Sequence, residues 1–199
     1  MIPTSDCVGI ILAGGTGSRL HPCTKVTNKH LLPIGEMPMI FYPLKKLVGA
    51  GITDILIVTG TEHMGDFISL LGSGKDFGCR LTYRVQDEAG GIAQALALAE
   101  RFANGQPMCV ILGDNIFEDS INGTIAEFMK EPTISHNILT EVTDNERFGV
   151  AADDCKRITK IIAKPAATPS HFAATRMDGY PGAVIELTKG ITTEELTEL

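Results

Sequence analysis

The chain has 199 residues, of which 44% are apolar and 21% charged, values that are ordinary for a globular protein and favour one domain. Its formal net charge of −7 argues against a nonspecific nucleic-acid binder, because such proteins gain affinity from Lys and Arg on phosphates. No segment reaches 18 consecutive apolar residues, and no charged N-terminal region precedes a long apolar run, so we expect neither a membrane span nor secretion.

Short, continuous apolar runs predict strands that are buried on both faces, as is typical of parallel sheets. These strands are expected at Val8–Leu12, Ile55–Val58 and Cys109–Leu112. A further segment, Leu81–Gln86, alternates apolar and polar residues and therefore predicts a more exposed strand.

Segments with helical spacing of apolar residues lie between these strands. The first predicted helix covers Met37–Val48, and Gly51 follows it as a stop. Met64–Leu71 predicts a shorter helix that ends at Gly72. The alanine- and leucine-rich segment Ile92–Phe102 predicts another helix.

Strand and helix alternate through about residue 130, which predicts βαβ units, a mostly parallel sheet and helices on both of its faces. Ligands of such folds bind beyond the carboxyl ends of the strands. After residue 135 the pattern predicts short strands with little helix between them, at Asn137–Val142, Phe148–Ala151 and Ile158–Ala163. A loop is expected at 166–169, and Thr192 with Glu195 resembles a capping box that opens a short last helix.

The cysteines are odd in number, and no two of them form a C-x-x-C pair, so neither a disulfide framework nor a zinc site is indicated. We expect reduced thiols in a cytoplasmic protein. The cysteines are Cys7, Cys23, Cys79, Cys109 and Cys155.

A glycine-rich segment, Leu12–Leu20 (LAGGTGSRL), begins at the end of the first strand. Its glycines allow a sharp turn that brings backbone N–H groups close to an anion, and Arg19 adds a guanidinium suited to phosphate. A tight turn that serves only packing is an equal alternative. The dinucleotide motif G-x-G-x-x-G fails because Leu20 stands at its last glycine, and the pair Gly74-Lys75 is followed by Asp76 rather than by the Ser or Thr of a P-loop.

Other polar residues stand at strand ends. Asp114 follows the strand at 109–112, where a carboxylate can hold Mg²⁺ that bridges substrate phosphates; a helix N-cap or an Asx-turn is the simpler explanation if the motif is taken alone. Gln86 ends a strand before Gly90-Gly91, and an amide there can pair with a base edge, although a polar turn residue is the simpler explanation if the motif is taken alone. Taken singly, Lys29, His30 and Lys164 are explained as surface or structural residues.

The motifs are more specific together than apart. The segments LAGGTGSRL, K-x-L-L-P, V-Q-D-x-x-G-G-I-A-Q-A, L-G-D-N-I-F, R-F-G-V and a late K-P occur in this order over residues 7–175. This set resembles the glucose-1-phosphate thymidylyltransferases of the sugar-1-phosphate nucleotidylyltransferase family. The resemblance implies a three-layer, Rossmann-like α/β fold with a mixed, mostly parallel sheet. It implies a single domain over 1–199, with a nucleotide-binding half at 1–130 and a shortened sugar-binding half at 131–199.

In that family an oxygen of a sugar 1-phosphate attacks the α-phosphorus of dTTP, and pyrophosphate leaves as the dTDP-sugar forms. The resemblance therefore implies dTTP and a sugar 1-phosphate, in the first place glucose 1-phosphate, as partners and Mg²⁺ as cofactor. No nucleic acid or membrane partner is expected, and a homo-oligomer is left open. The implied nucleotide-binding residues are Leu12, Ala13, Gly14, Gly15, Gly17, Gln86 and Gly91. The implied sugar-binding residues are Leu112, Asn115, Gly149 and Lys164. The implied catalytic residues are Arg19, Lys29, Asp114 and Lys164, of which Asp114 would also bind the metal.

Departures from the family pattern bear on activity. Ala163 stands where the family has a Glu that bonds a sugar hydroxyl, and Arg176 stands where it has Gly. The family's second metal-binding Asp lies in a W-x-D-x-G-type segment that this Trp-free sequence does not contain. Two hypotheses stay open: a nucleotidylyltransferase of reduced activity or altered sugar specificity, and a catalytically weak nucleotide-binding paralogue with a regulatory or interaction role. An NAD-binding Rossmann protein is a distant third, because Leu20 breaks its fingerprint.

Overall fold

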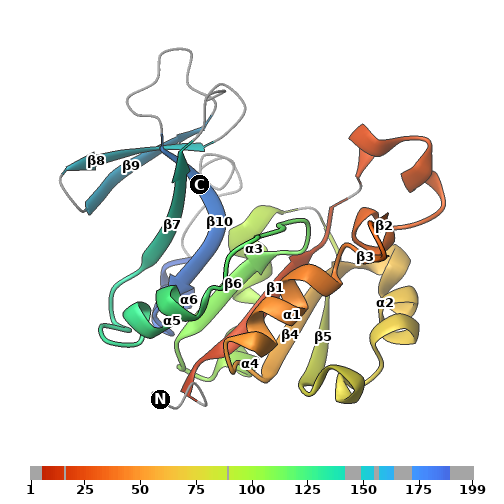
Figure 1. The fold of residues 1–199 in the computed structure, drawn as a ribbon, viewed down its shortest axis with the longest axis horizontal. Helices are drawn as coiled ribbons and strands as arrows, with labels where there is room; N and C mark the ends of the chain where they lie inside the picture. Colours follow the sequence, from red (N-terminus) through yellow and green to blue (C-terminus); the bar gives the residue numbers. More distant parts are fainter. Residues whose placement is uncertain are drawn as a thin grey trace.

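The computed structural model describes residues 6–15, 17–88, 90–141, 149–154, 157–163 and 172–188. Within these residues an eight-stranded sheet runs through the molecule in the order β5-β4-β1-β6-β10-β8-β9, and β7 pairs with β10 beside this path (Figure 1). Its strands are β1 (Val8–Ala13), β4 (Asp54–Gly60), β5 (Arg80–Gln86), β6 (Met108–Leu112), β7 (His136–Glu141), β8 (Gly149–Asp154), β9 (Arg157–Ala163) and β10 (Phe172–Tyr180). A separate two-stranded ribbon consists of β2 (Pro33–Ile34) and β3 (Met37–Pro38).

Helices cover both faces of the sheet, because each helix buries an apolar stripe against one of two core clusters. On one face lie α1 (Phe41–Gly49), α2 (Met64–Leu71) and α5 (Asn122–Phe128). On the other lie α3 (Gly91–Ala97), α4 (Glu100–Ala103) and α6 (Val184–Thr188). Short 3₁₀ turns are found at Ser18–Leu20, Cys23–Lys25, Lys29–Leu31, Thr61–His63 and Lys75–Phe77.

The central strand β1 shows why its sequence is continuously apolar. All six of its residues are buried, since Ile10 and Leu12 face the cluster under α3 while Ile11 faces the cluster under α1. β1 is parallel to both β4 and β6, and β4 is parallel to β5. The carboxyl ends of these four strands therefore meet at one edge of the sheet, which is where ligands of α/β folds bind.

The fold confirms the α/β prediction of a mixed sheet between two layers of helices, and the strands at 8–12, 55–58, 81–86 and 109–112 are found within a few residues of their expected ends. The short helix at Met64–Leu71 is also confirmed, and Gly72 ends it with a φ of 56°. No helix within the described part of the chain combines the length and apolarity needed to cross a membrane.

Two helix boundaries were wrong. The predicted helix at 37–48 begins only at Phe41, because Met37 precedes a proline, which disfavours helical backbone, and Met37–Pro38 pairs with β2 instead. The predicted helix at 92–102 is broken into α3 and α4. The break is a tight turn in which the Ala99 N–H bonds to Leu96 O, three residues back rather than four.

The later part of the chain contains the three predicted short strands as β7, β8 and β9. It also contains β10 and α6, which the sequence pattern did not predict. β10 pairs antiparallel with β6, so the expected nucleotide-binding and sugar-binding halves share one sheet. The loop expected at 166–169 and the helix expected at Thr192 lie outside the described residues.

Candidate active site

A cavity of about 270 Å³ opens at the carboxyl edge of the four parallel strands. We call it the strand-end cavity. Eight of the residues named from the sequence line it together with His30, Ile92 and Ala95: Leu12, Gly14, Gly15, Lys29, Gln86, Gly91, Leu112 and Asp114. The strand register explains this convergence, since Leu12 lies opposite Leu112 and Gly60 lies opposite Gln86.

Lys29 and Asp114 form an ion pair in this cavity. Lys29 Nζ lies 2.5 Å from Asp114 Oδ2, and the two side chains are 24% and 34% exposed. Burial raises the pKa of the Asp114 carboxyl, but the hydrogen bond and the positive charge of Lys29 outweigh this and hold the pKa below its ordinary value. Asp114 is therefore ionised at neutral pH. It does not cap a helix, because the next helix, α5, begins only at Asn122.

The turn that carries Lys29 is fixed by its buried neighbours. Asn28 Oδ1 accepts the backbone N–H of His30 at 2.9 Å and lies 2.6 Å from His30 Nδ1, while Asn28 Nδ2 donates to Ala13 O at the end of β1. His30 is 2% exposed; its burial, followed by the charge of Lys29, lowers its pKa to about 4, against an opposing effect of Asp114. His30 is therefore a neutral, structural histidine that holds Asn28, and Asn28 ties the Lys29 turn to the central strand.

The glycine-rich segment divides between the cavity and the surface. Gly14 and Gly15 line the strand-end cavity, whereas Gly17 turns the chain with a φ of 63° and its carbonyl accepts the Thr24 hydroxyl at 2.7 Å. Ala13 is fully buried. Arg19 is exposed and lines neither this cavity nor the second one described below.

Two of the expected sugar-binding residues, Leu112 and Asn115, share the turn after β6, where the Asn115 N–H donates to Leu112 O at 3.1 Å. Leu112 lines the strand-end cavity, while the Asn115 amide donates to Thr175 O and so joins the turn after β6 to β10. Gly149 is the first residue of β8 and pairs with Ala163 of β9. Lys164 lies outside the described residues, so its expected contact with the sugar phosphate stays a prediction.

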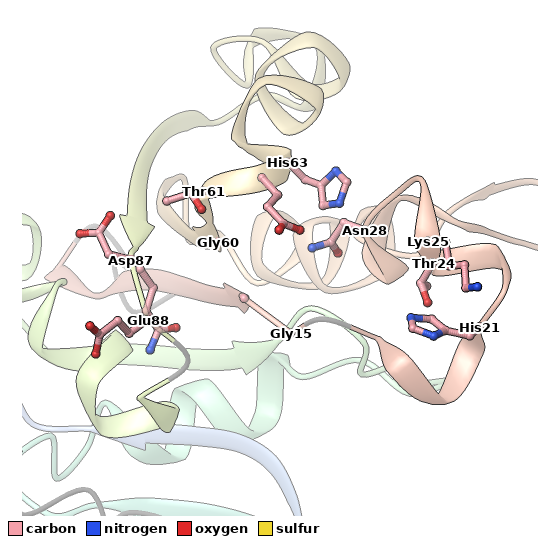
Figure 2. Close-up of a pocket in the computed structure, with 13 residues that line it drawn as sticks. Gly15, His21, Thr24, Lys25, Asn28, Gly60, Thr61, His63, Asp87 and Glu88 are labelled. Carbon is pink, nitrogen blue, oxygen red and sulfur yellow. The ribbon is translucent and has the colours of Figure 1, made fainter.

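A second, larger cavity of about 440 Å³ adjoins the first and shares Gly14, Gly15 and Gln86 with it. We call it the loop cavity. Figure 2 shows Asp87 and Glu88 on one side of Gly15 and His21 with Lys25 on the other. Its remaining lining residues are Thr24, Asn28, Gly60, Thr61, Glu62 and His63.

The charged residues of the loop cavity were not predicted from the sequence. A signal was present for part of them, because the turn Thr61–His63 follows β4 directly and so had to emerge at the same sheet edge as Gly14 and Gln86. The segment from His21 to Lys25 carried no such signal, since its position depends on how the chain returns from the glycine-rich turn.

A metal at this edge would rely on few protein ligands. Among the described residues, no group of three or more His, Cys, Asp and Glu side chains is placed to hold a metal ion together. Mg²⁺ is commonly bound through one or two carboxylates, with substrate phosphates and waters completing the shell. The ionised, partly exposed Asp114 fits this kind of shared site, and Lys29 supplies the balancing charge in the structure as it stands.

A parallel α/β sheet whose carboxyl edge carries a glycine-rich turn and a Lys–Asp pair is typical of nucleotide-binding enzymes. The chain belongs to the nucleotidyl transferase family, whose model matches residues 8–195. It is 39% identical over 193 residues to a glucose-1-phosphate thymidylyltransferase of Neisseria meningitidis, covering 96% of this chain and 67% of that one. It is 41% identical over 180 residues to the enzyme of the same name from Xanthomonas campestris, covering 87% and 60%. The chain thus spans about two thirds of the length of these relatives or somewhat less.

Solved structures agree with this family. A Bacillus anthracis protein assigned as a glucose-1-phosphate thymidylyltransferase, in complex with sucrose, superposes with a TM-score of 0.92 at 50% identity, covering 97% of this chain and 79% of that one. A UDP-glucose pyrophosphorylase in complex with UDP-glucose has a TM-score of 0.79 at 22% identity, over 92% and 79% of the two chains, and shows the fold alone. The family resemblance is therefore confirmed, and the alternative of a catalytically weak nucleotide-binding paralogue with a regulatory or interaction role is not favoured.

Proposed function

We propose that the protein transfers the thymidylyl group of dTTP to a sugar 1-phosphate, with glucose 1-phosphate as the favoured acceptor, and releases pyrophosphate. The observation that carries this proposal is the Lys29–Asp114 pair, 2.5 Å apart beside Gly14 and Gly15. Phosphoryl-type transfers depend on positioning and on charges aimed at the reacting phosphates, and here a cation, a carboxylate suited to a metal ion and loop amides lie close together. The names of the relatives from Neisseria and Xanthomonas support dTTP and glucose 1-phosphate.

In the proposed reaction an oxygen of the sugar 1-phosphate forms a bond to the α-phosphorus of dTTP. The bond from this phosphorus to the bridging oxygen of the pyrophosphate breaks, and the leaving pyrophosphate keeps the electron pair. Lys29 would bind the outer phosphates and offset the charge that develops on the leaving group. Asp114 would hold Mg²⁺, which supplies further neutralisation of phosphate charge when bound.

The ion pair between Lys29 and Asp114 has to open for these roles. Both side chains are partly exposed, so the pair is worth about 1 kcal/mol or less. A nucleotide that arrives with its cation offers Lys29 a phosphate and Asp114 a metal, which more than offsets this cost. We therefore regard the pair as the resting arrangement of two groups that separate upon substrate binding.

The walls of the strand-end cavity suit the rest of the substrates. Leu12, Ile92 and Leu112 offer apolar surface to a base or a sugar ring, and the Gln86 amide is available to the thymine edge. We further propose that Arg19 reaches the outer phosphates from the neighbouring turn, and that Asn115, Gly149 and Lys164 serve the sugar side. Ala163 in place of Glu would remove one charged hydrogen bond to a sugar hydroxyl, worth about 1.5–3 kcal/mol.

The direct test is an assay of pyrophosphate release with Mg²⁺, dTTP and glucose 1-phosphate. We expect release that requires both substrates and that falls strongly when dCTP or ATP replaces dTTP. Omitting glucose 1-phosphate is the matched control, because slow hydrolysis of dTTP would release pyrophosphate without transfer. Release that does not depend on any sugar 1-phosphate would overturn the proposal.

A further inference from the structure

The amide of Gln86 is held by two partners at the entrance of α3. Gln86 Nε2 donates to Gly91 O at 3.1 Å and to Gln94 Oε1 at 2.7 Å, so both of its hydrogens are engaged. Gln94 Oε1 also accepts the backbone N–H of Gly90 at 3.1 Å. These bonds link four groups, and of the two glutamines Gln86 lines the strand-end cavity while Gln94 does not.

The orientation of both amides follows from backbone atoms whose identity is certain. A carbonyl oxygen only accepts, so the Gln86 atom that faces Gly91 O must be nitrogen. A backbone N–H only donates, so the Gln94 atom that faces Gly90 must be oxygen. The bond between the two side chains agrees with both assignments, and a flip of either amide would oppose two donors or two acceptors.

The remaining atom of the Gln86 amide, Oε1, is turned toward the glycine-rich segment. A Cβ placed on Gly14 would lie 3.0 Å from it, and Gly14 lines both cavities. Among the described residues no hydrogen bond to this oxygen is formed. Gln86 therefore offers an incoming ligand an acceptor and no donor.

Gly90, which directly precedes α3, makes this arrangement sterically feasible. A Cβ on Gly90 would lie 2.4 Å from Cδ and Oε1 of Gln94, far closer than atoms can approach. Only glycine at this position lets the Gln94 amide reach the backbone and Gln86 at once. The motif V-Q-D-x-x-G-G-I-A-Q-A thus has a physical reason for its last glutamine as well as for its first.

We infer that Gln94 is a positioning residue for nucleobase selection: it fixes Gln86 with its carbonyl oxygen toward the base, so that the site takes a pyrimidine with an N–H at position 3 and rejects one with a lone pair there. Thymine and uracil carry this N–H, whereas cytosine presents an acceptor. This inference rests on the proposed function, because it assigns a specificity element to the same nucleotide site. It differs from a two-sided pairing of Gln86 with thymine, since the Gln86 donors are already used.

The experiment compares dTTP and dCTP binding by calorimetry in the unmodified protein, Gln94→Met and Gln94→Glu, with Mg²⁺ present. Methionine has a similar length but cannot accept the hydrogen bonds of Gly90 and Gln86, whereas glutamate can accept both. We expect the unmodified protein to prefer dTTP by about tenfold or more, the usual penalty for opposing two acceptors. Gln94→Glu should keep this ratio of dTTP to dCTP affinity, even if its added charge lowers the affinity for both nucleotides. Gln94→Met should bring the ratio close to one.

A merely structural role of Gln94 would lower the affinity for dTTP and dCTP alike and leave their ratio unchanged, and that outcome in Gln94→Met overturns the inference. Equal binding of dTTP and dCTP by the unmodified protein overturns it as well, while leaving nucleotidyl transfer intact. Failure to bind any nucleoside triphosphate would instead remove the proposed function, so the two failures are distinguishable.

Discussion

Replacement of Lys29 by methionine should change metal binding and nucleotide binding in opposite directions. In the free protein Lys29 forms an ion pair with Asp114, in which Nζ lies 2.5 Å from Oδ2 and both side chains are partly exposed. Lys29 competes with a metal ion for Asp114, and an ion pair of this exposure is worth about 1 kcal/mol. Without Lys29, Asp114 should therefore bind Mn²⁺ alone up to about fivefold more tightly. The lost charge-assisted bond to a phosphate costs about 1.5–3 kcal/mol, and subtracting the pair energy leaves about 0.5–2 kcal/mol, or about two- to thirtyfold weaker dTTP binding.

Electron paramagnetic resonance of Mn²⁺ without nucleotide, and calorimetry of dTTP with Mg²⁺, measure the two effects separately. Lys75→Met is the matched control, because Lys75 is exposed and lines neither cavity. It should leave both affinities unchanged. Unaltered Mn²⁺ binding in Lys29→Met would refute the idea that Lys29 holds the metal ligand in the resting state, and unaltered dTTP binding would refute its contact with phosphate.

Three further predictions concern His30, Arg19 and the core residue Phe67. In the unmodified protein the free energy of unfolding should fall by up to about 3 kcal/mol as the pH drops from 6.5 to 4. The reason is that His30 binds a proton in the unfolded chain over this range, whereas in the folded protein its lowered pKa of about 4 keeps it neutral. Urea unfolding of His30→Gln should lack this component, and equal pH slopes for the two proteins would contradict the assignment. Arg19→Ala should lower the affinity for dTTP by about ten- to a hundredfold and the affinity for dTMP far less. Equal losses of affinity in calorimetry would place Arg19 away from the outer phosphates. Phe67→Ala should destabilise the protein by about 3–5 kcal/mol, whereas its exposed neighbour Ile68→Ala should cost less than about 1 kcal/mol, and similar losses would mean that Phe67 is not a core residue.

The strands of the parallel part were predictable because burial on both faces leaves a local mark. Val8 to Ala13 is apolar at every position, and its neighbours β4 and β6 show the same run. The start of α1 was not predictable from periodicity, because Met37 continues the apolar spacing while Pro38 forces extended backbone and a pairing with β2. Here backbone restriction outweighs the hydrophobic pattern.

β10 was missed for a different reason. Its segment Phe172–Tyr180 contains Arg, Asp and Gly and has no clear period of two, and its identity as a strand comes from pairing with β6, β7 and β8. Such pairing joins residues far apart in the chain and leaves little local signal. The same limit applies to α6, which is short and packs in the cluster beneath α3.

The candidate site was predictable residue by residue but not as an arrangement. Lys29 and Asp114 are 85 residues apart, and only the parallel register of β1 and β6 brings them into contact. The role of Gln94 was also hidden, since its spacing from Gln86 is meaningful only after Gly90 and Gly91 have turned the chain into α3.

The central claim is most directly tested by pyrophosphate release from dTTP and glucose 1-phosphate, measured with Mg²⁺ for the unmodified protein and for Asp114→Asn. The substitution keeps the size of the side chain and removes the charge that a hard cation requires. The account predicts release that depends on both substrates in the unmodified protein and a loss of at least about a hundredfold in the variant, since metal stabilisation of phosphate charge is worth several kcal/mol. Equal release by the two proteins would contradict the metal-binding role of Asp114, and no release by the unmodified protein would contradict the proposed transfer itself.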